Sequence, residues 1–291
     1  MLNLQPQPPP IPARARDTRL AIIGDVGGHW HCFAHCLDAL GVDVDNATMP
    51  NDLVVVQVGD LIGSRATDER IVDLVDHFLT LEPSRWIQLI GNWEVGALQG
   101  VYLKYKEREQ PSTGLRHTLQ RWTRTRRARP ATALRTRGGH PLLVSHAGVT
   151  RGFWARFLHS TGDASVAANA LNKMPLRGGP LDMAGEMVGR RCDTPGPIWA
   201  SATEVWSSWL HTPMPFHQVH GHTNPCFWGR GRWNDDLSAD VKRACTLNDQ
   251  LRHTSFELNG RRIVSVDPGL GHHPRPGDLQ PLMLRNAEVF W

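Results

Sequence analysis

Five short apolar segments of the sequence each lead into a residue whose side chain can bind a metal ion. These residues are, in chain order, Asp25, Asp60, Asn92, His146 and the pair His220 and His222. Open α/β sheets hold ligands at the carboxyl ends of their strands, so buried strands that end in such residues would bring them together. One segment alone would say little, because Asp and Asn also cap helices at such positions. The ordered set of carboxylate, amide and imidazole groups predicts a hydrolytic site with two metal ions.

The expected site needs a carboxylate that bridges both ions. Two divalent cations about 3.5–4 Å apart can hold the attacking and the leaving oxygen of a phosphoryl transfer. Asp60 suits the bridging position, because it follows a largely hydrophobic strand and a glycine that permits a tight turn. Asp25 can bind one ion, while Asn92 and His146 can bind the other. His220 and His222 flank a glycine, so one loop offers two imidazoles.

Alternating strands and helices are expected to position these groups. The expected strands lie near 19–24, 53–59 and 86–90, and the expected helices near 29–40, 67–80 and 94–108. This alternation predicts parallel βαβ units. A basic helix at 113–127 and a strand at 141–145 follow. Asn259-Gly260 between two β-rich stretches predicts a hairpin with a type I′ turn. Residues 282–291 could supply a closing strand. Together these elements favour a mixed α/β fold of two packed sheets flanked by helices.

The sequence favours one domain. Residues 1–18 have the composition of a disordered Pro-rich tail, and 19–291 are expected to form the domain, with a basic helical insertion near 101–140. That insertion holds 11 Lys or Arg and two acids, a local charge of +9 in a chain of net charge +4. A solvated Arg-rich surface is favoured over nucleic-acid binding. Five scattered cysteines and the lack of a long apolar run favour a cytoplasmic protein without membrane contact.

The segments around the metal-binding residues resemble the signature blocks of one family. These segments are Gly24–Gly28, Gly59–Gly63, Gly91–Glu94, Ser145–Gly148 and Gly221–Pro225. They resemble the calcineurin-like metallophosphoesterases, and are most similar to the branch of phosphoprotein phosphatases and bacterial dinucleoside tetraphosphatases. The resemblance runs from about 19 to 271. It implies a four-layer fold, a double β-sandwich flanked by helices.

The resemblance also implies a reaction and a ligand set. The reaction is hydrolysis of a phosphoester or phosphoanhydride by a hydroxide that bridges two divalent ions, with Mn²⁺ expected and Fe, Zn, Ni or Mg as alternatives. Asp25 and Asp60 would bind the first ion, and Asp60, Asn92, His146 and His222 the second. Asp25, Asp60, Asn92 and His146 are thus also the expected catalytic residues. His220 stays open as a further ligand or a neighbour.

Several positions depart from the family pattern. Gly27 stands where the family has a histidine that binds the first ion, and His29 could substitute or simply open the helix. Trp93 stands in place of the histidine that protonates the leaving oxygen, and Gly63 in place of the aspartate that orients it. Loss of a general acid costs roughly 10²–10⁴-fold in rate.

Two further departures concern substrate contacts and the last block. Ser64 replaces a phosphate-binding arginine, with Arg65 beside it, and Asn224 replaces the second histidine of the last block. Trp93 could stack on a nucleobase or narrow the pocket, although buried packing is the more common role of Trp.

These departures favour a small phosphorylated, nucleotide-like substrate with a good leaving group over a protein substrate. The alternative is a catalytically impaired module that binds metal or phosphate and acts through a partner.

Overall fold

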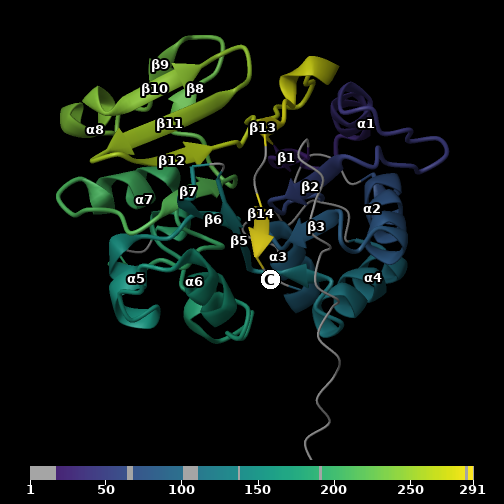
Figure 1. The fold of residues 1–291 in the computed structure, drawn as a ribbon, viewed down its shortest axis with the longest axis horizontal. Coiled ribbons are helices and arrows are strands. Elements are labelled where there is room, and N and C mark those ends of the chain that lie inside the picture. The colour runs from purple at the N-terminus through teal and green to yellow at the C-terminus, as the bar shows by residue number, and fades with distance from the viewer. Residues whose placement is uncertain are drawn as a thin grey trace, which may run out of the picture.

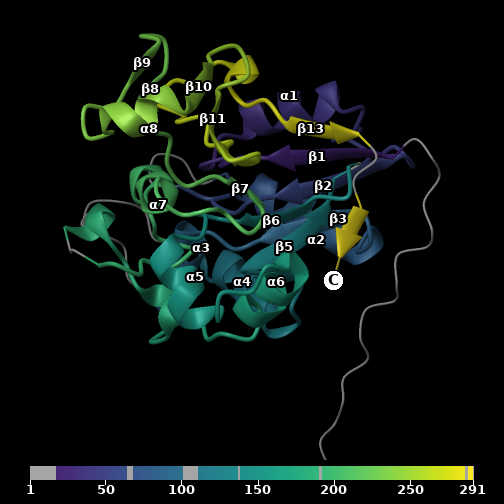
Figure 2. The same ribbon diagram turned by 60° about the vertical axis from the view of Figure 1, so that its left-hand side comes forward.

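Two mixed β-sheets face each other, and helices cover both outer faces (Figures 1 and 2). This computed structural model describes residues 18–63, 68–100, 111–136, 138–189, 192–285 and 288–290. The first sheet has the order β13-β1-β2-β3-β4. Its strands are β1 (Arg19–Ile23), β2 (Leu53–Gln57), β3 (Trp86–Leu89), β4 (Ala128–Arg129) and β13 (Leu282–Arg285). The arrangement confirms the four-layer fold that the sequence motifs imply.

The parallel part of the first sheet follows from its βαβ pattern. Strands β1, β2 and β3 are parallel neighbours, linked by α1 (Trp30–Ala39) and α2 (Glu69–Leu81), which confirms the alternation expected from the sequence. Side chains of β1 alternate between its two faces: Ala21 and Ile23 pack against the helices, whereas Leu20 and Ile22 pack against the second sheet. Burial on both faces explains why these strands are apolar throughout.

The second sheet completes the sandwich. Its order is β10-β11-β12-β7-β6-β5-β14. Its strands are β5 (Ala131–Arg135), β6 (Pro141–Ser145), β7 (His217–His220), β10 (Cys245–Asn248), β11 (His253–Leu258), β12 (Arg261–Ser265) and β14 (Glu288–Phe290). The expected hairpin is present, because β11 and β12 are antiparallel around Asn259 and Gly260, whose φ angles of 52° and 73° suit a type I′ turn. A small separate pair is formed by β8 (Cys226–Phe227) and β9 (Arg232–Trp233).

The helices form two groups, one on each outer face. The remaining α-helices are α3 (Asn92–Gln99), α4 (Thr113–Arg124), α5 (Arg151–Phe157), α6 (Ala164–Leu171), α7 (Ala202–Trp209) and α8 (Ala239–Arg243), and the short 3₁₀ helices are η1 (Pro180–Asp182), η2 (Glu186–Val188) and η3 (Pro276–Asp278). Helices α1, α2 and α4 pack on the first sheet, whereas α5 and α6 pack on β5 and β6 of the second (Figure 1). Trp206 of α7 and Phe256 of β11 belong to a further buried cluster.

Some elements differ from the sequence prediction. The helix expected at 94–108 begins at Asn92 and ends at Gln99, because Gly100 adopts a left-handed conformation with a φ of 68°. In the expected basic helical insertion, 113–124 is helical, whereas 128–135 forms β4 and β5. The expected closing strand consists of β13, which pairs with β1, and β14, which pairs with β5.

The described part of the chain leaves some expectations open. The Pro-rich stretch 1–17 and residues 101–110 lie outside the described residues, so the domain boundaries stay a prediction. None of the helices in the described ranges has the length and apolar character of a membrane span. All five cysteines are free.

Candidate metal centre

The carboxyl ends of strands from both sheets deliver the predicted ligands to one place. Asp25 follows β1, Asp60 follows β2, and Asn92 is the first residue of α3, shortly after β3. From the second sheet, His146 directly follows β6 and His222 follows β7. Parallel strands have their carboxyl ends at the same edge, which is why residues so distant in sequence meet.

Three side-chain atoms from different segments of the chain converge in this centre. The Nε2 atom of His146 lies 3.1 Å from Asn92 Oδ1 and 3.1 Å from His222 Nδ1, and the latter two atoms are 3.0 Å apart. The carboxylate of Asp60 lies 3.5 Å from His146 Nε2. Asp60, His146 and His222 are all buried or partly buried, and their ligand atoms form a candidate metal site.

The hydrogen bonding of His146 fixes which nitrogen faces the centre. Its Nδ1 atom lies 3.0 Å from the carbonyl oxygen of Val58, which can only accept, so Nδ1 carries the hydrogen and Nε2 presents a lone pair. Burial lowers the pKa of His146 well below its usual value and that of His222 to about 4, so both rings are neutral near pH 7. The oxygen of Asn92 also only accepts, and a neutral His222 ring carries one hydrogen. The three contacts among His146 Nε2, His222 Nδ1 and Asn92 Oδ1 therefore cannot all be hydrogen bonds. A divalent cation fits this donor set.

Four carboxylates lie around the same centre: Asp60, Glu94 and Asp267 are buried, and Asp25 is partly buried. Burial raises the pKa of each of them, and the charge of Asp267 further raises the pKa of Asp25, while Asp25 does the same for Asp60. Among the described residues, no Lys or Arg forms an ion pair with any of the four, and the contact from neutral His146 to Asp60 carries no counter-charge. Buried carboxylates without counter-charge are strongly unfavourable, so this cluster also fits bound cations.

Backbone amides orient the two aspartates. The backbone N–H of His222 donates to both oxygens of Asp25, at 3.0 and 2.9 Å. The N–H of Trp93 donates to Asp60 Oδ1 at 3.0 Å, which leaves the other oxygen of Asp60 facing His146. Each carboxylate is therefore held in one orientation by a backbone N–H group.

Glu94 holds two of the loops together rather than facing the imidazoles. Its carboxylate accepts the backbone N–H groups of Asp60 at 2.8 Å, Gly91 at 2.8 Å and Ile62 at 3.3 Å. The loop after β2 and the loop after β3 are thus fastened through one buried side chain.

The ligand loops need glycine because they touch each other's backbones. A Cβ atom on Gly91 would lie 2.1 Å from Asp60 Oδ1, and one on Gly221 would lie 2.0 Å from Asp25 Oδ1. Asp60 and His222 adopt left-handed conformations, with φ angles of 55° and 68°. Such strain is characteristic of functional sites, where the surrounding structure maintains it.

Other residues that the sequence singles out lie elsewhere. His220 uses both ring nitrogens outside the cluster: Nδ1 lies 2.9 Å from the Gly221 carbonyl oxygen, and Nε2 accepts the indole N–H of Trp206 at 3.3 Å. His29 is buried and packs edge-on against His31, outside the ligand cluster. The half-buried ring of Trp93 packs against the core beneath the helices, as expected for most Trp residues. Arg65 lies outside the described residues.

Asp267 is a member of the carboxylate cluster that the sequence motifs did not single out. It follows the end of β12, and the preceding Ile263 and Val266 are buried. An acid shortly after a strand end marks Asp267 as it marks Asp25 and Asp60, but the signal is weaker because β12 is only partly buried.

Two surface hollows differ in their relation to the centre. One, of about 480 Å³, is lined by Gly28, His29, Trp30 and His31 and by 68–70, directly after the first ligand loop. The guanidinium of Arg70 lies 4.8 Å from the ring centre of Trp30 there.

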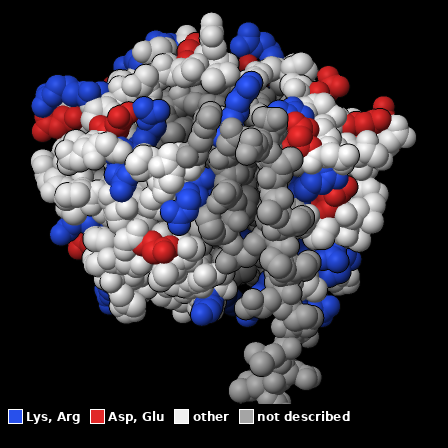
Figure 3. All heavy atoms as spheres, in the orientation of Figure 1, with Lys and Arg blue, Asp and Glu red and all other residues white. Residues whose placement is uncertain are grey.

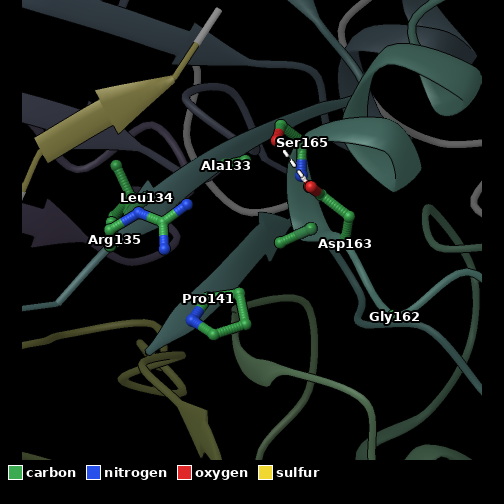
Figure 4. Close-up of a pocket in the computed structure, with 8 residues that line it drawn as sticks. Ala133, Leu134, Arg135, Pro141, Gly162, Asp163 and Ser165 are labelled. Atoms are coloured by element: carbon green, nitrogen blue, oxygen red, sulfur yellow. Dashed lines mark hydrogen bonds between the residues drawn. The ribbon is translucent and has the colours of Figure 1, made fainter. Parts of the chain in front are cut away.

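The other hollow, of about 140 Å³, lies beside β5 and α6 and contains none of the candidate ligands (Figure 4). In it the Asp163 carboxylate points toward Ser165 and caps α6. Its polar groups are therefore already used within the fold.

Two solved phosphatase structures align with most of the chain. The structure of a serine/threonine phosphatase from Saccharomyces cerevisiae is similar over 93% of this chain and 80% of the phosphatase chain, at 11% sequence identity and a TM-score of 0.48. A cold-active protein-tyrosine phosphatase from a Shewanella species aligns with 92% of this chain and 80% of its own, at 16% identity and a TM-score of 0.44. No curated protein matches the chain in sequence. The family model of calcineurin-like phosphoesterases matches residues 18–226, which contain all the candidate ligands described above except Asp267, and the chain belongs to that family.

Proposed function

We propose that this protein is a metal-dependent phosphoesterase that hydrolyses a phosphoester or phosphoanhydride of a small phosphorylated molecule. The observation that carries the proposal is the convergence of His146 Nε2, His222 Nδ1 and Asn92 Oδ1 within 3.1 Å of one another, with Asp60 beside them. Family membership supports the reaction class.

The protein's own groups prepare the site. Two divalent cations, Mn²⁺ or a similar first-row metal, would supply Lewis acidity and an activated water when bound. Asp60 would bridge them, Asp25 would hold the first, and Asn92, His146 and His222 would hold the second. The Val58 carbonyl keeps the His146 lone pair directed at the centre, and the His222 amide keeps Asp25 in place.

The leaving group is restricted by what the site lacks. Trp93 and Gly63 replace the family's acid pair, and the Trp93 ring packs against the core. Without a general acid the reaction is slower by roughly 10²–10⁴-fold for a basic leaving group, and much less affected for a weakly basic one. Phosphoanhydrides, aryl esters and cyclic phosphates are therefore the favoured substrates.

The hollow beside Trp30 could receive the organic part of such a substrate. It starts at Gly28, and the loop before it lies on the Asp60 loop, because the N–H groups of Val26 and Gly27 donate to the Asp60 carbonyl oxygen at 3.0 and 2.8 Å. The guanidinium of Arg70 lies over the Trp30 ring in this hollow and pairs with Asp68 at 2.6 Å, so an aromatic ring and a charged pair line it.

Nucleic acid is a less favoured partner. In the basic stretch, Arg121 pairs with Asp76 at 2.7 Å and Arg127 donates to Thr80 at 2.9 Å, so these arginines attach α4 and the segment after it to α2. On the face shown in Figure 3, basic and acidic side chains are interspersed rather than separated into one basic surface. These contacts support the reading of the stretch as a structural, solvated surface.

The decisive experiment measures turnover of an aryl phosphate, an aryl phosphodiester and a dinucleoside polyphosphate by the Mn²⁺-loaded protein. Asp60→Asn is expected to abolish turnover and weaken Mn²⁺ binding. Asp163→Asn is the matched control, since Asn can also cap a helix, and it should retain full activity. Unchanged turnover in Asp60→Asn would refute the proposal. Two bound ions without turnover on any substrate would instead favour the impaired binding module.

A further inference from the structure

His220 is fully buried beside the metal centre, although neither of its ring nitrogens faces the ligand cluster. Its Nδ1 atom lies 2.9 Å from the carbonyl oxygen of Gly221, which can only accept a hydrogen bond. Its Nε2 atom lies 3.3 Å from the indole nitrogen of Trp206, whose N–H can only donate. Both contacts require the same neutral tautomer, with the hydrogen on Nδ1. The ring is therefore a donor to the Gly221 carbonyl.

Packing holds this donor in place. A Cβ atom on Gly148 would lie 3.2 Å from the ring carbon Cδ2 of His220, so backbone lies against the ring. Trp206 is itself fully buried, and its ring stacks on Phe256 with the ring centres 6.0 Å apart. Helix α7 therefore supports the His220 ring through a side chain that is itself fixed in the core.

The carbonyl group that His220 holds belongs to the same peptide unit as the N–H of His222. A trans peptide unit is planar, so its C=O and N–H groups point in opposite directions. The N–H donates to both carboxylate oxygens of Asp25, at 3.0 and 2.9 Å. The C=O accepts from His220 and from the backbone N–H of Thr223 at 2.8 Å. One orientation of this peptide thus serves Asp25 on one side and His220 on the other.

This orientation needs support because the turn that contains it is strained. The hydrogen bond from Thr223 to the Gly221 carbonyl closes a γ-turn around His222, whose φ angle is 68°. A γ-turn with a positive φ at its central residue is the rare form, and a residue with a Cβ disfavours it. Strained conformations persist only where the surrounding structure determines them. Rotation of the peptide would turn its N–H away from Asp25.

We propose that His220 and Trp206 are positioning residues of the metal centre, which together fix the Gly221–His222 peptide so that its N–H is directed at Asp25. Neither residue binds an ion. Their role is to keep two ligands of the centre, Asp25 and His222, in register through one shared peptide. The inference rests on the two-metal centre of the proposed function but not on turnover.

The first test measures the peptide directly, by NMR of ¹⁵N-labelled protein in EDTA. His220→Leu removes the donor and keeps an apolar side chain, so the His222 amide should exchange roughly 10-fold faster than in wild type. His220→Asn can place an amide N–H near the position of Nδ1, and should restore slow exchange. Amides in β6 and β12 report on the stability of the sheet, so an increase confined to residues 222 and 223 identifies rotation of this peptide. The imidazole spectrum of wild type should show His220 with its hydrogen on Nδ1.

The second test measures Mn²⁺ affinity by calorimetric titration. His220→Leu should bind Mn²⁺ roughly 10–100-fold more weakly, as is typical when a residue that orients metal ligands is lost, and His220→Asn should recover most of this affinity. Trp206→Phe should also weaken binding. Trp209→Phe is the matched control, because Trp209 is equally buried on the same helix and donates at 2.9 Å to the Val149 carbonyl, which also accepts from Gln218. It should keep the affinity of wild type.

Unchanged His222 exchange or unchanged Mn²⁺ affinity in His220→Leu would overturn the inference, and so would a wild-type His220 with its hydrogen on Nε2. If His220→Asn binds as weakly as His220→Leu, or Trp209→Phe as weakly as Trp206→Phe, the effect is a loss of packing and the inference is wrong. The tautomer is measured on wild type, so this arm does not depend on the folding of any variant. A wild type that binds Mn²⁺ but hydrolyses nothing would refute the proposed function and leave the role of His220 intact.

Discussion

A Cβ atom on Gly63 would lie 2.5 Å from the carbonyl oxygen of Gly27. These glycines stand at two positions where the family has functional side chains, an acid-orienting aspartate at 63 and a metal-binding histidine at 27. The loops that carry them are packed together, since the N–H of Gly28 also donates to the Leu61 carbonyl oxygen at 2.8 Å. The absence of a side chain at 63 therefore leaves room for the backbone at 27.

We expect Gly63→Ala to lower the free energy of unfolding by about 1–3 kcal/mol, because the added methyl group meets backbone atoms that cannot rotate away. Gly162→Ala is the matched control, since a Cβ there meets nothing within 4 Å. Urea denaturation in EDTA compares the two variants. If Gly63→Ala is as stable as Gly162→Ala, the loops can separate and the two departures are independent.

Glu94 should contribute to metal affinity without binding metal. In Glu94→Gln, the amide group can accept through only one oxygen, so at least one of the N–H groups of Asp60, Gly91 and Ile62 loses its partner. We expect a loss of about 1–3 kcal/mol in unfolding free energy and weaker Mn²⁺ binding, because Asp60 is then less well held. Calorimetric titration with Mn²⁺ and urea denaturation measure the two effects.

The control for Glu94 is Glu204→Gln. Glu204 also accepts two backbone N–H groups, from Ser201 at 2.8 Å and Glu186 at 3.0 Å, but it caps α7 and holds none of the backbone N–H groups that Glu94 holds. The Glu204→Gln variant should have a lower free energy of unfolding and an unchanged affinity for Mn²⁺. Equal metal affinity in both variants would show that Glu94 serves the fold alone.

The sequence predicts much of this centre because the relevant signal is local. Each ligand loop follows a buried strand, and strand periodicity together with the βαβ order determines where that strand ends. Asp25, Asp60, Asn92, His146 and His222 could be found in this way. The side chains of the last four lie together, whereas the Asp25 carboxylate accepts the backbone N–H of His222.

Contacts between distant segments were not predictable in the same way. The ring of His220 turns away because Trp206, on another element, donates to it, and no spacing in the His-Gly-His segment reveals that partner. Asp267 has a weaker form of the local signal, and its closeness to Asp25 depends on how the backbone at Val266 packs against Gly24. The early end of α3 follows from the left-handed Gly100, whose sequence context permits either a helix end or a tolerated glycine.

Asp76 provides a pH-dependent link between α2 and α4. Its carboxylate accepts the indole N–H of Trp122 at 2.7 Å and pairs with Arg121 at 2.7 Å. Burial alone would raise the pKa of Asp76, but the hydrogen bonds from Trp122 and Arg121 outweigh it, so the pKa lies below its ordinary value. A carboxyl with a lowered pKa in the folded state stabilises the fold above its unfolded pKa of about 3.9, and this contribution is lost as the pH falls below that value.

We therefore expect Asp76→Asn to lower the free energy of unfolding by about 1–3 kcal/mol at pH 7, and by less at pH 3, because the carboxyl of the unfolded chain takes up a proton below its pKa of about 3.9. Urea denaturation at both pH values measures the difference. Asp73→Asn, at an exposed position of the same helix, should show little effect at either pH. A destabilisation by Asp76→Asn that is the same at pH 7 and pH 3 would mean that the shape of the side chain, not its charge, attaches α4 to the rest of the fold.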